Sequence, residues 1–226
     1  MKIAVLGTGM VGQAIAGRLA ELGHRVRVGT RDVAATMART GPDEMGNPPY
    51  PEWATAHPTV TLETFAEAAA SAELIVNATS GHVSIAALTA AGAEHLAGKV
   101  LLDIANPLDH SRGFPPTLFV KNSDSLGEQI QAAFPDLKVV KALNTLTAAL
   151  MANPGDLAGG QHSVFVAGND ADAKKTVTVL LEAFGHTDVI DLGDITSARG
   201  TEMYLPLWLR LMGSLKTPFF NLKVVR

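Results

Sequence analysis

Short apolar runs alternate with helical patterns along most of the chain. Residues 2–6 form an apolar run without alternation, as expected of a strand buried on both faces. Residues 10–22 then carry apolar side chains at helical spacing, and Gly23 ends that pattern. Further runs predict strands at residues 24–28, 59–62, 73–78, 99–104, 138–143, 162–167 and 188–192.

Helical patterns occupy most of the intervals between these strands. They cover residues 33–39, 63–71, 84–91, 125–134, 148–152, 171–184 and 195–215. Because strand and helix alternate with short links, the sequence predicts an α/β fold, a doubly wound parallel sheet of the Rossmann type. The pattern changes after Thr145, so we expect a domain at residues 1–145 and a small C-terminal α/β part at residues 146–226. The latter is either a second layer or an extension of the first sheet.

Two segments leave alternatives open. Gly41 to Pro58 is rich in proline and glycine and is expected to be irregular and at the surface. It is either a binding loop or a loop held down by Tyr50 and Trp53. Near the C-terminus, the apolar stripe of the 195–215 segment is either core or a dimer interface.

Composition excludes several classes of protein. The 226 residues carry a formal net charge of −4, so no global basic field indicates a nucleic-acid or membrane partner. The chain has no cysteine, which excludes disulfides and thiolate metal sites and fits a reducing cytoplasm. No apolar stretch is long enough to span a bilayer. We therefore expect a cytoplasmic protein.

The first strand leads directly into a complete G-x-G-x-x-G motif. It comprises Gly7, Thr8, Gly9, Met10, Val11 and Gly12. Between a strand and a helix, this motif brings backbone close to a pyrophosphate, and the helix N-terminus favours the phosphate charge. The sequence thus predicts a dinucleotide site.

The end of the second strand indicates which dinucleotide binds. Thr30 and Arg31 follow the predicted strand and can both donate to a 2′-phosphate, the arginine through two N–H groups. Asp32 comes next, at about the separation from Gly12 at which NAD-binding proteins place an acidic residue. We favour NADP because the threonine and arginine precede the aspartate.

Three later strands also end in small or polar residues. In doubly wound sheets, ligands bind at the carboxyl ends of the strands. Small residues there leave room for a flat ring, and amide or hydroxyl groups can bond a carboxamide, although the same residues also form ordinary turns. The candidates for cofactor contact are Asn77, Ala78, Thr79, Ala105, Asn106, Pro107 and Asn144.

The chain has no evident acid–base set. Tyr50 and Tyr204, the two tyrosines, lack a lysine four residues on, and the seven histidines show no metal-ligand spacing. His82 is the histidine at a strand end, and with Asn144 it is the candidate for contact with the reacting groups. We predict no metal and no acid–base residue. This absence is consistent with hydride transfer between two redox cofactors, which needs positioning more than proton chemistry.

Nearly the whole chain resembles the coenzyme F420-dependent NADP oxidoreductases. The resemblance rests on residues 3–12, 29–31, 139–145, 167–170, 174–175, 191–195, 197–199, 202 and 205–207. It implies hydride transfer between NADP and a deazaflavin, a 2′-phosphate held by Thr30 and Arg31, and a homodimer. It also implies that the two rings stack in a cleft between the nucleotide domain and the C-terminal part.

The chain departs from this family at several positions. Asp32 replaces a second basic residue, Thr79 and Ser80 replace a proline and a tryptophan of archaeal members, and Asn144 replaces a histidine. A flavin or quinone-like acceptor therefore stays open. Two other functions also remain, an NADPH-dependent reductase of a small carbonyl or imine and a non-catalytic NADP sensor.

Overall fold

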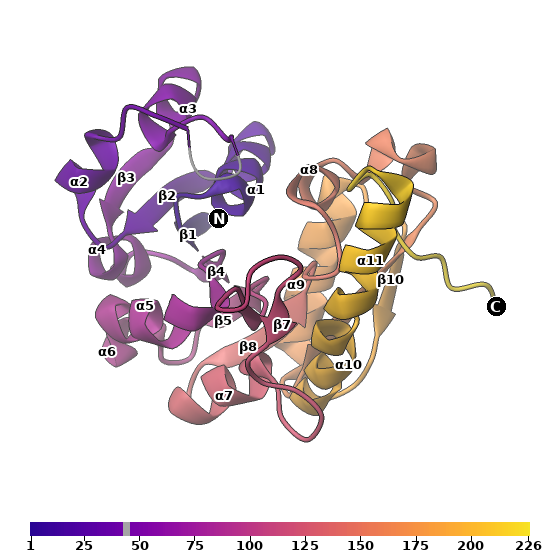
Figure 1. Ribbon diagram of the computed structural model, residues 1–226. Helices are drawn as coiled ribbons and strands as arrows, with labels where there is room; N and C mark the ends of the chain where they lie inside the picture. Colours follow the sequence, from indigo (N-terminus) through magenta and orange to yellow (C-terminus); the bar gives the residue numbers. More distant parts are fainter. Residues whose placement is uncertain (43–45) are drawn as a thin grey trace.

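The computed structural model describes residues 1–42 and 46–226 and has one large sheet (Figure 1). Its strands lie in the order β10-β9-β8-β5-β4-β1-β2-β3. The bounds are β1 Lys2–Leu6, β2 Arg25–Thr30, β3 Thr61–Thr64, β4 Leu74–Asn77, β5 Val100–Asp103, β8 Lys138–Ala142, β9 Ser163–Gly168 and β10 Asp188–Asp191. Six neighbouring strands of this sheet run parallel: β8, β5, β4, β1, β2 and β3. The chain reverses its direction of winding between β1 and β4. The predicted Rossmann-type fold is confirmed.

Helices cover both faces of the sheet. They are α1 Met10–Glu21, α2 Val33–Met37, α3 Tyr50–Ala56, α4 Phe65–Ala70, α5 Ser84–Ala91, α6 Ala93–Leu96, α7 Leu126–Ala133, α8 Ala148–Ala152, α9 Ala171–Phe184, α10 Ala198–Met203 and α11 Leu205–Leu215. Strand residues alternate between two cores: Ile3 and Val5 pack with α1, α8 and α9, whereas Ala4 and Leu6 pack with α4, α5 and α7. Burial on both faces explains why the strands read as continuous apolar runs.

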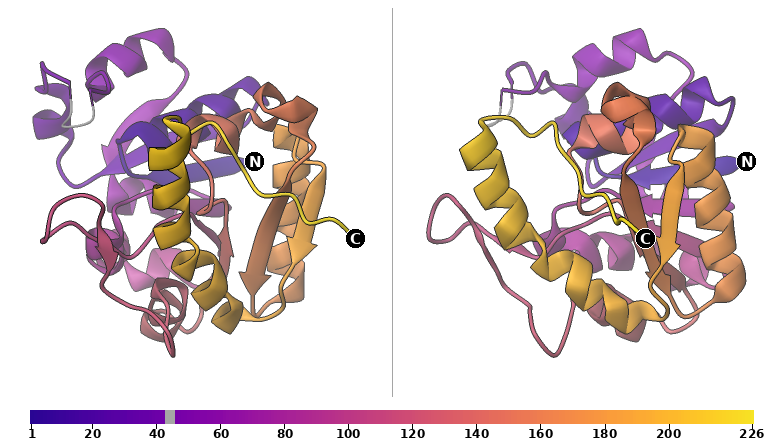
Figure 2. Two further views of the ribbon diagram at one scale, coloured as in Figure 1. Left: turned by 45° about the vertical axis from the view of Figure 1, so that its right-hand side comes forward. Right: turned by 90° about the vertical axis from the view of Figure 1, so that its right-hand side faces the viewer.

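The C-terminal residues extend the same sheet. β9 pairs antiparallel with β8, and β10 pairs parallel with β9. Of the two arrangements that the sequence allowed, the structure has the extension. The chain then forms α10 and α11 and returns toward β9 (Figure 2). There, Leu222 O accepts from Ser163 N at 2.9 Å. The division at residue 145 stays a prediction.

The structure corrects the expectation for the segment from Gly41 to Pro58. Residues 50–56 form α3, with Pro51 in its first turn, where a proline costs no hydrogen bond. Tyr50 is buried, and its ring centroid lies 5.3 Å from that of Trp53. The part of the segment at residues 43–45 lies outside the described residues. The packing of these aromatic rings supports a segment that is held down, while Asn47 of the same segment lines a pocket of the candidate site, so each alternative has a structural basis.

Other element boundaries differ from the pattern by a few residues. β2 continues to Thr30 because Thr30 pairs with Thr64 of β3. The last helical segment is divided near Tyr204 into α10 and α11, and Pro206 lies in the first turn of α11. A hairpin of β6 (Leu108–Asp109) and β7 (Thr117–Leu118) was not predicted, because two-residue strands leave no periodic signal.

Candidate functional site

The glycine motif forms a turn from β1 into α1 that leaves room for phosphate. Gly7 has φ +122°, which favours glycine, and a Cβ on Gly12 would lie 2.1 Å from the carbonyl oxygen of Gly7. Gly9 is the N-cap of α1 and has no side chain that could cap the helix. A Cβ added at Gly9 would meet no atom within 4 Å. The start of α1 is thus open to a bound group, as a pyrophosphate requires.

Two pockets meet at this turn, along the carboxyl ends of the strands. We name them the Arg31 pocket and the Asn144 pocket, and each has a volume of about 390 Å³. Both are lined by Gly9, Ala78, Thr79 and Ser80. They therefore adjoin at the point between β1 and β4 where the winding reverses, which is where ligands of such sheets bind.

The Arg31 pocket carries two guanidinium groups. Arg31 is exposed and has no hydrogen bond or ion pair to a residue that the structure describes. Arg39 also lines this pocket, and its Nη1 donates to Thr8 Oγ1 at 3.4 Å. Two cations at the end of β2 suit a phosphate dianion. Sequence reasoning missed Arg39 because only α2 brings it back beside Arg31.

Thr30 and Asp32 lie in the same pocket with their polar groups engaged. Thr30 Oγ1 lies 2.8 Å from Thr36 Oγ1 of α2, and both residues are buried. Asp32 Oδ1 accepts from Ala35 N at 2.9 Å and so caps α2. The carboxylate that argued for NAD thus has a structural task of its own.

The Asn144 pocket gathers residues from three strand ends. Asn106 Nδ2 donates to Asn144 O at 2.9 Å, and Asn144 Nδ2 donates to Asn106 Oδ1 at 3.0 Å. Leu143, at φ +61°, turns the chain in front of Asn144. Gly81 lies so close to Asn106 that a Cβ would be 2.1 Å from its carbonyl oxygen. The predicted residues that line this pocket are Gly9, Met10, Val11, Ala78, Thr79, Ala105, Asn106 and Asn144.

Two predicted strand-end residues line neither pocket. Asn77 is fully buried: its Nδ2 donates to Asp103 Oδ1 at 2.8 Å, and its Oδ1 accepts from Thr79 Oγ1 at 2.7 Å. Pro107 is also buried outside them. In these positions the two residues support the pocket walls.

The histidine at the Asn144 pocket is His110, which sequence reasoning did not select. His82 lies outside both pockets and stacks on Phe119, with ring centroids 4.5 Å apart. His110 follows β6, so only the unpredicted hairpin could have indicated it. Among the described residues that line this pocket, His110 is the only histidine.

The C-terminal part supplies another wall of the Asn144 pocket. Leu205 and Trp208 of α11 line it, together with Ala148 and Met151 of α8. The sequence offered the α11 stripe as core or dimer interface and did not connect it with the site. A flat ring bound against the strand ends would therefore be flanked by α11.

The described residues show neither a metal centre nor a membrane span. Within residues 1–42 and 46–226, no three His, Asp or Glu side chains are grouped so as to hold a metal ion. Within the same ranges, no helix has the length and apolar character needed to cross a membrane.

Comparisons with known proteins agree with this geometry. Residues 2–107 match the family described as NADP oxidoreductase, coenzyme F420-dependent. The F420-dependent NADP reductase of Methanothermobacter marburgensis is 30% identical over 217 residues, which are 93% of this chain and 92% of that protein. Metalloreductase STEAP3 of Rattus norvegicus is 32% identical over 96% of this chain, but the chain spans only 38% of that protein.

A solved structure is similar over the full length. It is the crystal structure of a candidate F420-dependent NADP-reductase from Arthrobacter sp. FB24, with 63% identity, a TM-score of 0.95 and coverage of 100% of both chains. The resemblance inferred from the sequence motifs is confirmed. The chain belongs to the F420-dependent NADP oxidoreductase family and is an NADP-dependent oxidoreductase.

Proposed function

We propose that this enzyme transfers a hydride between NADP(H) and a deazaflavin, coenzyme F420, or a similar flavin-like acceptor. The observation that carries the proposal is the junction of the two pockets at Gly9 and residues 78–80, which joins a cationic end to a neutral cleft. An extended dinucleotide with a phosphorylated ribose has the complementary distribution of charge, because its 2′-phosphate is anionic. The family and its F420-dependent relatives support F420 as the acceptor.

The adenosine half of the cofactor is assigned to the Arg31 pocket. Arg31 and Arg39 bind the 2′-phosphate, and the Thr30 hydroxyl donates to it, because all three side chains line this pocket beside the end of β2. The motif from Gly7 to Gly12 receives the pyrophosphate at the start of α1.

The nicotinamide half is assigned to the Asn144 pocket. Ala78 and Ala105 leave space for a flat ring, while Thr79, Asn106 and Asn144 offer hydroxyl and amide groups for the carboxamide. When bound, the nicotinamide supplies the hydride chemistry, so the protein has to align the rings and exclude water. The apolar side chains of Met10, Leu205 and Trp208 suit that task.

The wider organisation forms part of the same proposal. Residues 1–145 bind NADP, and residues 146–226 complete the cleft and contribute dimer contacts. The exposure of Leu207, Leu215 and Phe219 (54%, 53% and 47%) supports a homodimer through the C-terminal part. The cysteine-free composition still leads us to expect a cytoplasmic protein.

The decisive experiment adds NADPH to the protein and F420 and follows the deazaflavin absorbance. We expect the absorbance of that band to fall at a rate proportional to the protein concentration. At low NADPH concentration, Arg31→Ala should not show this fall. Flavin, imine and ketone acceptors are tested in parallel. Turnover of imines or ketones alone would support a carbonyl or imine reductase, and tight NADPH binding without any turnover would support a sensor.

A further inference from the structure

A fully buried lysine occupies the carboxyl edge of the sheet. Lys141 of β8 is paired in register with Asp103 of β5, and its Nζ lies 2.7 Å from Asp103 Oδ2. Both side chains are completely inaccessible to solvent. Removing a charged pair from water costs free energy, and an apolar pair of similar volume is often equally stable or more stable. Stability alone therefore does not explain this pair.

A second carboxylate reaches the same ammonium group from the C-terminal part. Glu202 of α10 places Oε1 2.8 Å from Lys141 Nζ, and its side chain is 2% exposed. Its two oxygens also accept from Leu126 N and Gly127 N, at 2.8 and 3.1 Å. Because these N–H groups begin α7, the positive end of that helix balances the second carboxylate.

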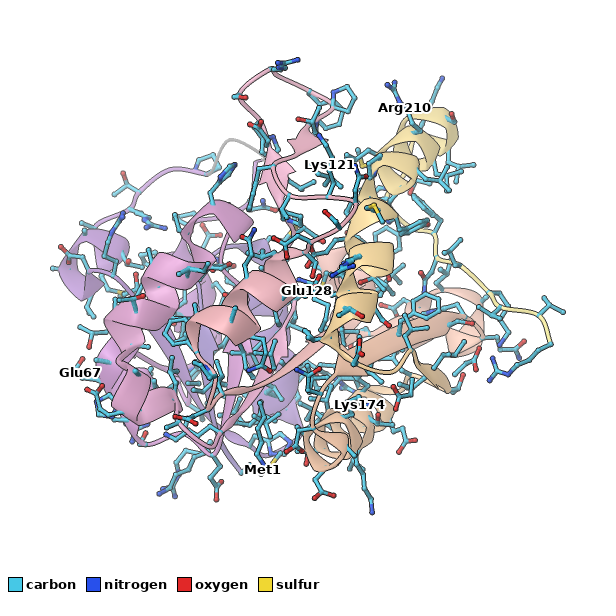
Figure 3. The ribbon with its side chains drawn as sticks, turned by 90° about the horizontal axis from the view of Figure 1, so that it is seen from below. Met1, Glu67, Lys121, Glu128, Lys174 and Arg210 are labelled. Carbon is cyan, nitrogen blue, oxygen red and sulfur yellow. The ribbon has the colours of Figure 1, made fainter. Side chains whose placement is uncertain are left out.

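The charge state of Lys141 follows from its neighbours. Burial by itself would lower its pKa, but Asp103 and Glu202 outweigh burial and raise the pKa above the ordinary value. Lys141 is therefore a fixed cation at neutral pH. Glu128 of α7, labelled in Figure 3, lies on the more exposed side of the contact between α7 and α10. Its Oε2 accepts from Arg199 Nε of α10 at 2.8 Å.

The buried ions are bonded to the strand ends of the Asn144 pocket. Lys141 Nζ donates to Ala105 O at 2.6 Å. On the other side, Asp103 accepts from Asn77, and Asn77 accepts from the Thr79 hydroxyl. Ala105 and Thr79 both line the pocket, so two of its strand ends are tied to one ammonium–carboxylate centre.

The same centre also holds the opposite wall. Glu202 precedes Leu205 by three residues, and Leu205 and Trp208 line the Asn144 pocket from α11. A change in the contact between Lys141 and Glu202 would move α11 relative to the strand ends. In the proposed function, these are the two sides between which the hydride passes.

We propose that Lys141, through Asp103 and Glu202, is a positioning residue that sets the separation between the nicotinamide side and the acceptor side of the cleft. This inference rests on the proposed function. Neither Lys141 nor Glu202 lines the Arg31 pocket or the Asn144 pocket. Their effect on the reaction therefore passes through the walls that they hold.

The test compares Glu202→Gln and Lys141→Met with the wild-type enzyme. Glutamine keeps one oxygen, which can still accept from Lys141 Nζ and Gly127 N, and it removes the acceptor of Leu126 N. Lys141 stays paired with Asp103, so the buried charges remain balanced. In single turnover with F420, we expect the hydride-transfer rate to fall about tenfold or more per active site. The deuterium isotope effect with NADPH labelled at C4 should become more dependent on temperature, because the separation of donor and acceptor is less well fixed.

A binding measurement separates this inference from the proposed function. Affinity for NADP⁺ should fall severalfold, whereas affinity for adenosine 2′,5′-bisphosphate should stay within about twofold, because Ala105, Leu205 and Trp208 line the Asn144 pocket and not the Arg31 pocket. This split needs no acceptor. If wild-type protein fails to reduce F420 but the split is found, the proposed function fails and the positioning role toward the nicotinamide stands.

Lys138→Met is the matched control. Lys138 lies on the same strand, and its ion pair with Asp170, 3.0 Å long, is half exposed. This variant should match the wild type in both measurements. If Lys141→Met does not fold, Glu202→Gln carries the same expectations. The proposal is overturned if a folded variant loses only the amplitude of the single turnover and keeps its rate, isotope effect and NADP⁺ affinity, since that result indicates a purely structural role.

Discussion

The hydroxyl of Thr30, at the end of β2, lies 2.8 Å from the hydroxyl of Thr36 on α2. The two residues are 6% and 1% exposed, so water does not compete for this contact. The bond ties α2 to the end of the strand and thereby sets where Arg39, two residues beyond α2, returns toward Arg31. In the proposed function, recognition of the 2′-phosphate thus depends in part on a contact between two uncharged residues.

Replacing Thr36 by valine should weaken NADPH binding selectively. Valine keeps the shape of threonine and removes the partner of Thr30, at a cost of about 1 kcal/mol, or about fivefold in Kd. The Kd for NADH should stay unchanged. Calorimetry checks both, with Thr176→Val on α9 as the control, because its hydroxyl bonds only the exposed helix backbone. Equal losses for both nucleotides would contradict a role in phosphate recognition.

Arg31→Ala and Arg39→Ala should each raise the KM for NADPH about tenfold or more. A hydrogen bond to a charged group contributes about 1.5–3 kcal/mol, and both guanidinium groups line the pocket assigned to the 2′-phosphate. The KM for NADH should change less than about twofold. Steady-state kinetics with both nucleotides makes the comparison. If Arg39→Ala has the same KM for NADPH as the wild type, Arg39 does not contribute to binding of the 2′-phosphate.

Gly81→Ala should damage the nicotinamide end of the site. Its new Cβ would lie 2.1 Å from the carbonyl oxygen of Asn106, so the Asn106–Asn144 pair has to move. We expect a loss of about tenfold or more in kcat with a small change in affinity for adenosine 2′,5′-bisphosphate. Gly200→Ala on α10 is the control, because its Cβ would meet no atom within 4 Å and should stabilise the helix by up to about 1 kcal/mol. Unchanged kcat in Gly81→Ala would show that Asn106 can yield without effect.

Stability should decline as the pH falls below neutrality because of His186. Burial lowers the pKa of His186 to about 4 from 6.5, while Met151 O, 3.0 Å from its Nε2, favours the charged form and His162 disfavours it. Since the folded pKa lies below the unfolded value, the contribution is fully present above pH 6.5 and is lost between pH 6.5 and 4. The loss approaches about 3 kcal/mol at the lower limit.

Urea unfolding at several pH values between 7.5 and 4 measures this loss. His186→Gln can still donate to Met151 O but cannot titrate, so its free energy of unfolding should fall less steeply over the same range. Met151 belongs to α8 and lines the Asn144 pocket. When protonation of His186 destabilises its contact with α8, the wild type should therefore also lose affinity for NADP⁺. An equal slope in wild type and variant would assign the acid sensitivity to other groups.

Local pattern was sufficient for most of the elements. The apolar run of β1, the glycine motif and the helical pattern of α1 follow one another in the chain, so the phosphate turn could be recognised without the fold. Asp32 and Ser125, which cap α2 and α7, are residue types that favour the N-cap position, so these helix starts are also local features. Where prolines stood together before Tyr50, however, the pattern indicated a loop, and burial of Tyr50 made it a helix instead.

The candidate site was less predictable, because strand ends alone do not show which side chains face a ligand. Asn77, Asn106 and Asn144 read alike in the sequence. In the structure Asn77 turns to Asp103 while the other two bond each other beside the pocket. Arg39, His110 and Trp208 were missed since none lies at the end of a main-sheet strand.

The sequence by itself determined the dinucleotide-binding half: the turn after β1, the helix that follows it and the basic residue after β2 are all local. Tertiary structure decided what lies opposite. It joined β9 to the same sheet in the antiparallel direction, brought α11 to the Asn144 pocket and gave Lys141 two carboxylates from distant elements. Short-range patterns specify backbone geometry, whereas the balance of buried charges depends on which distant segments pack together.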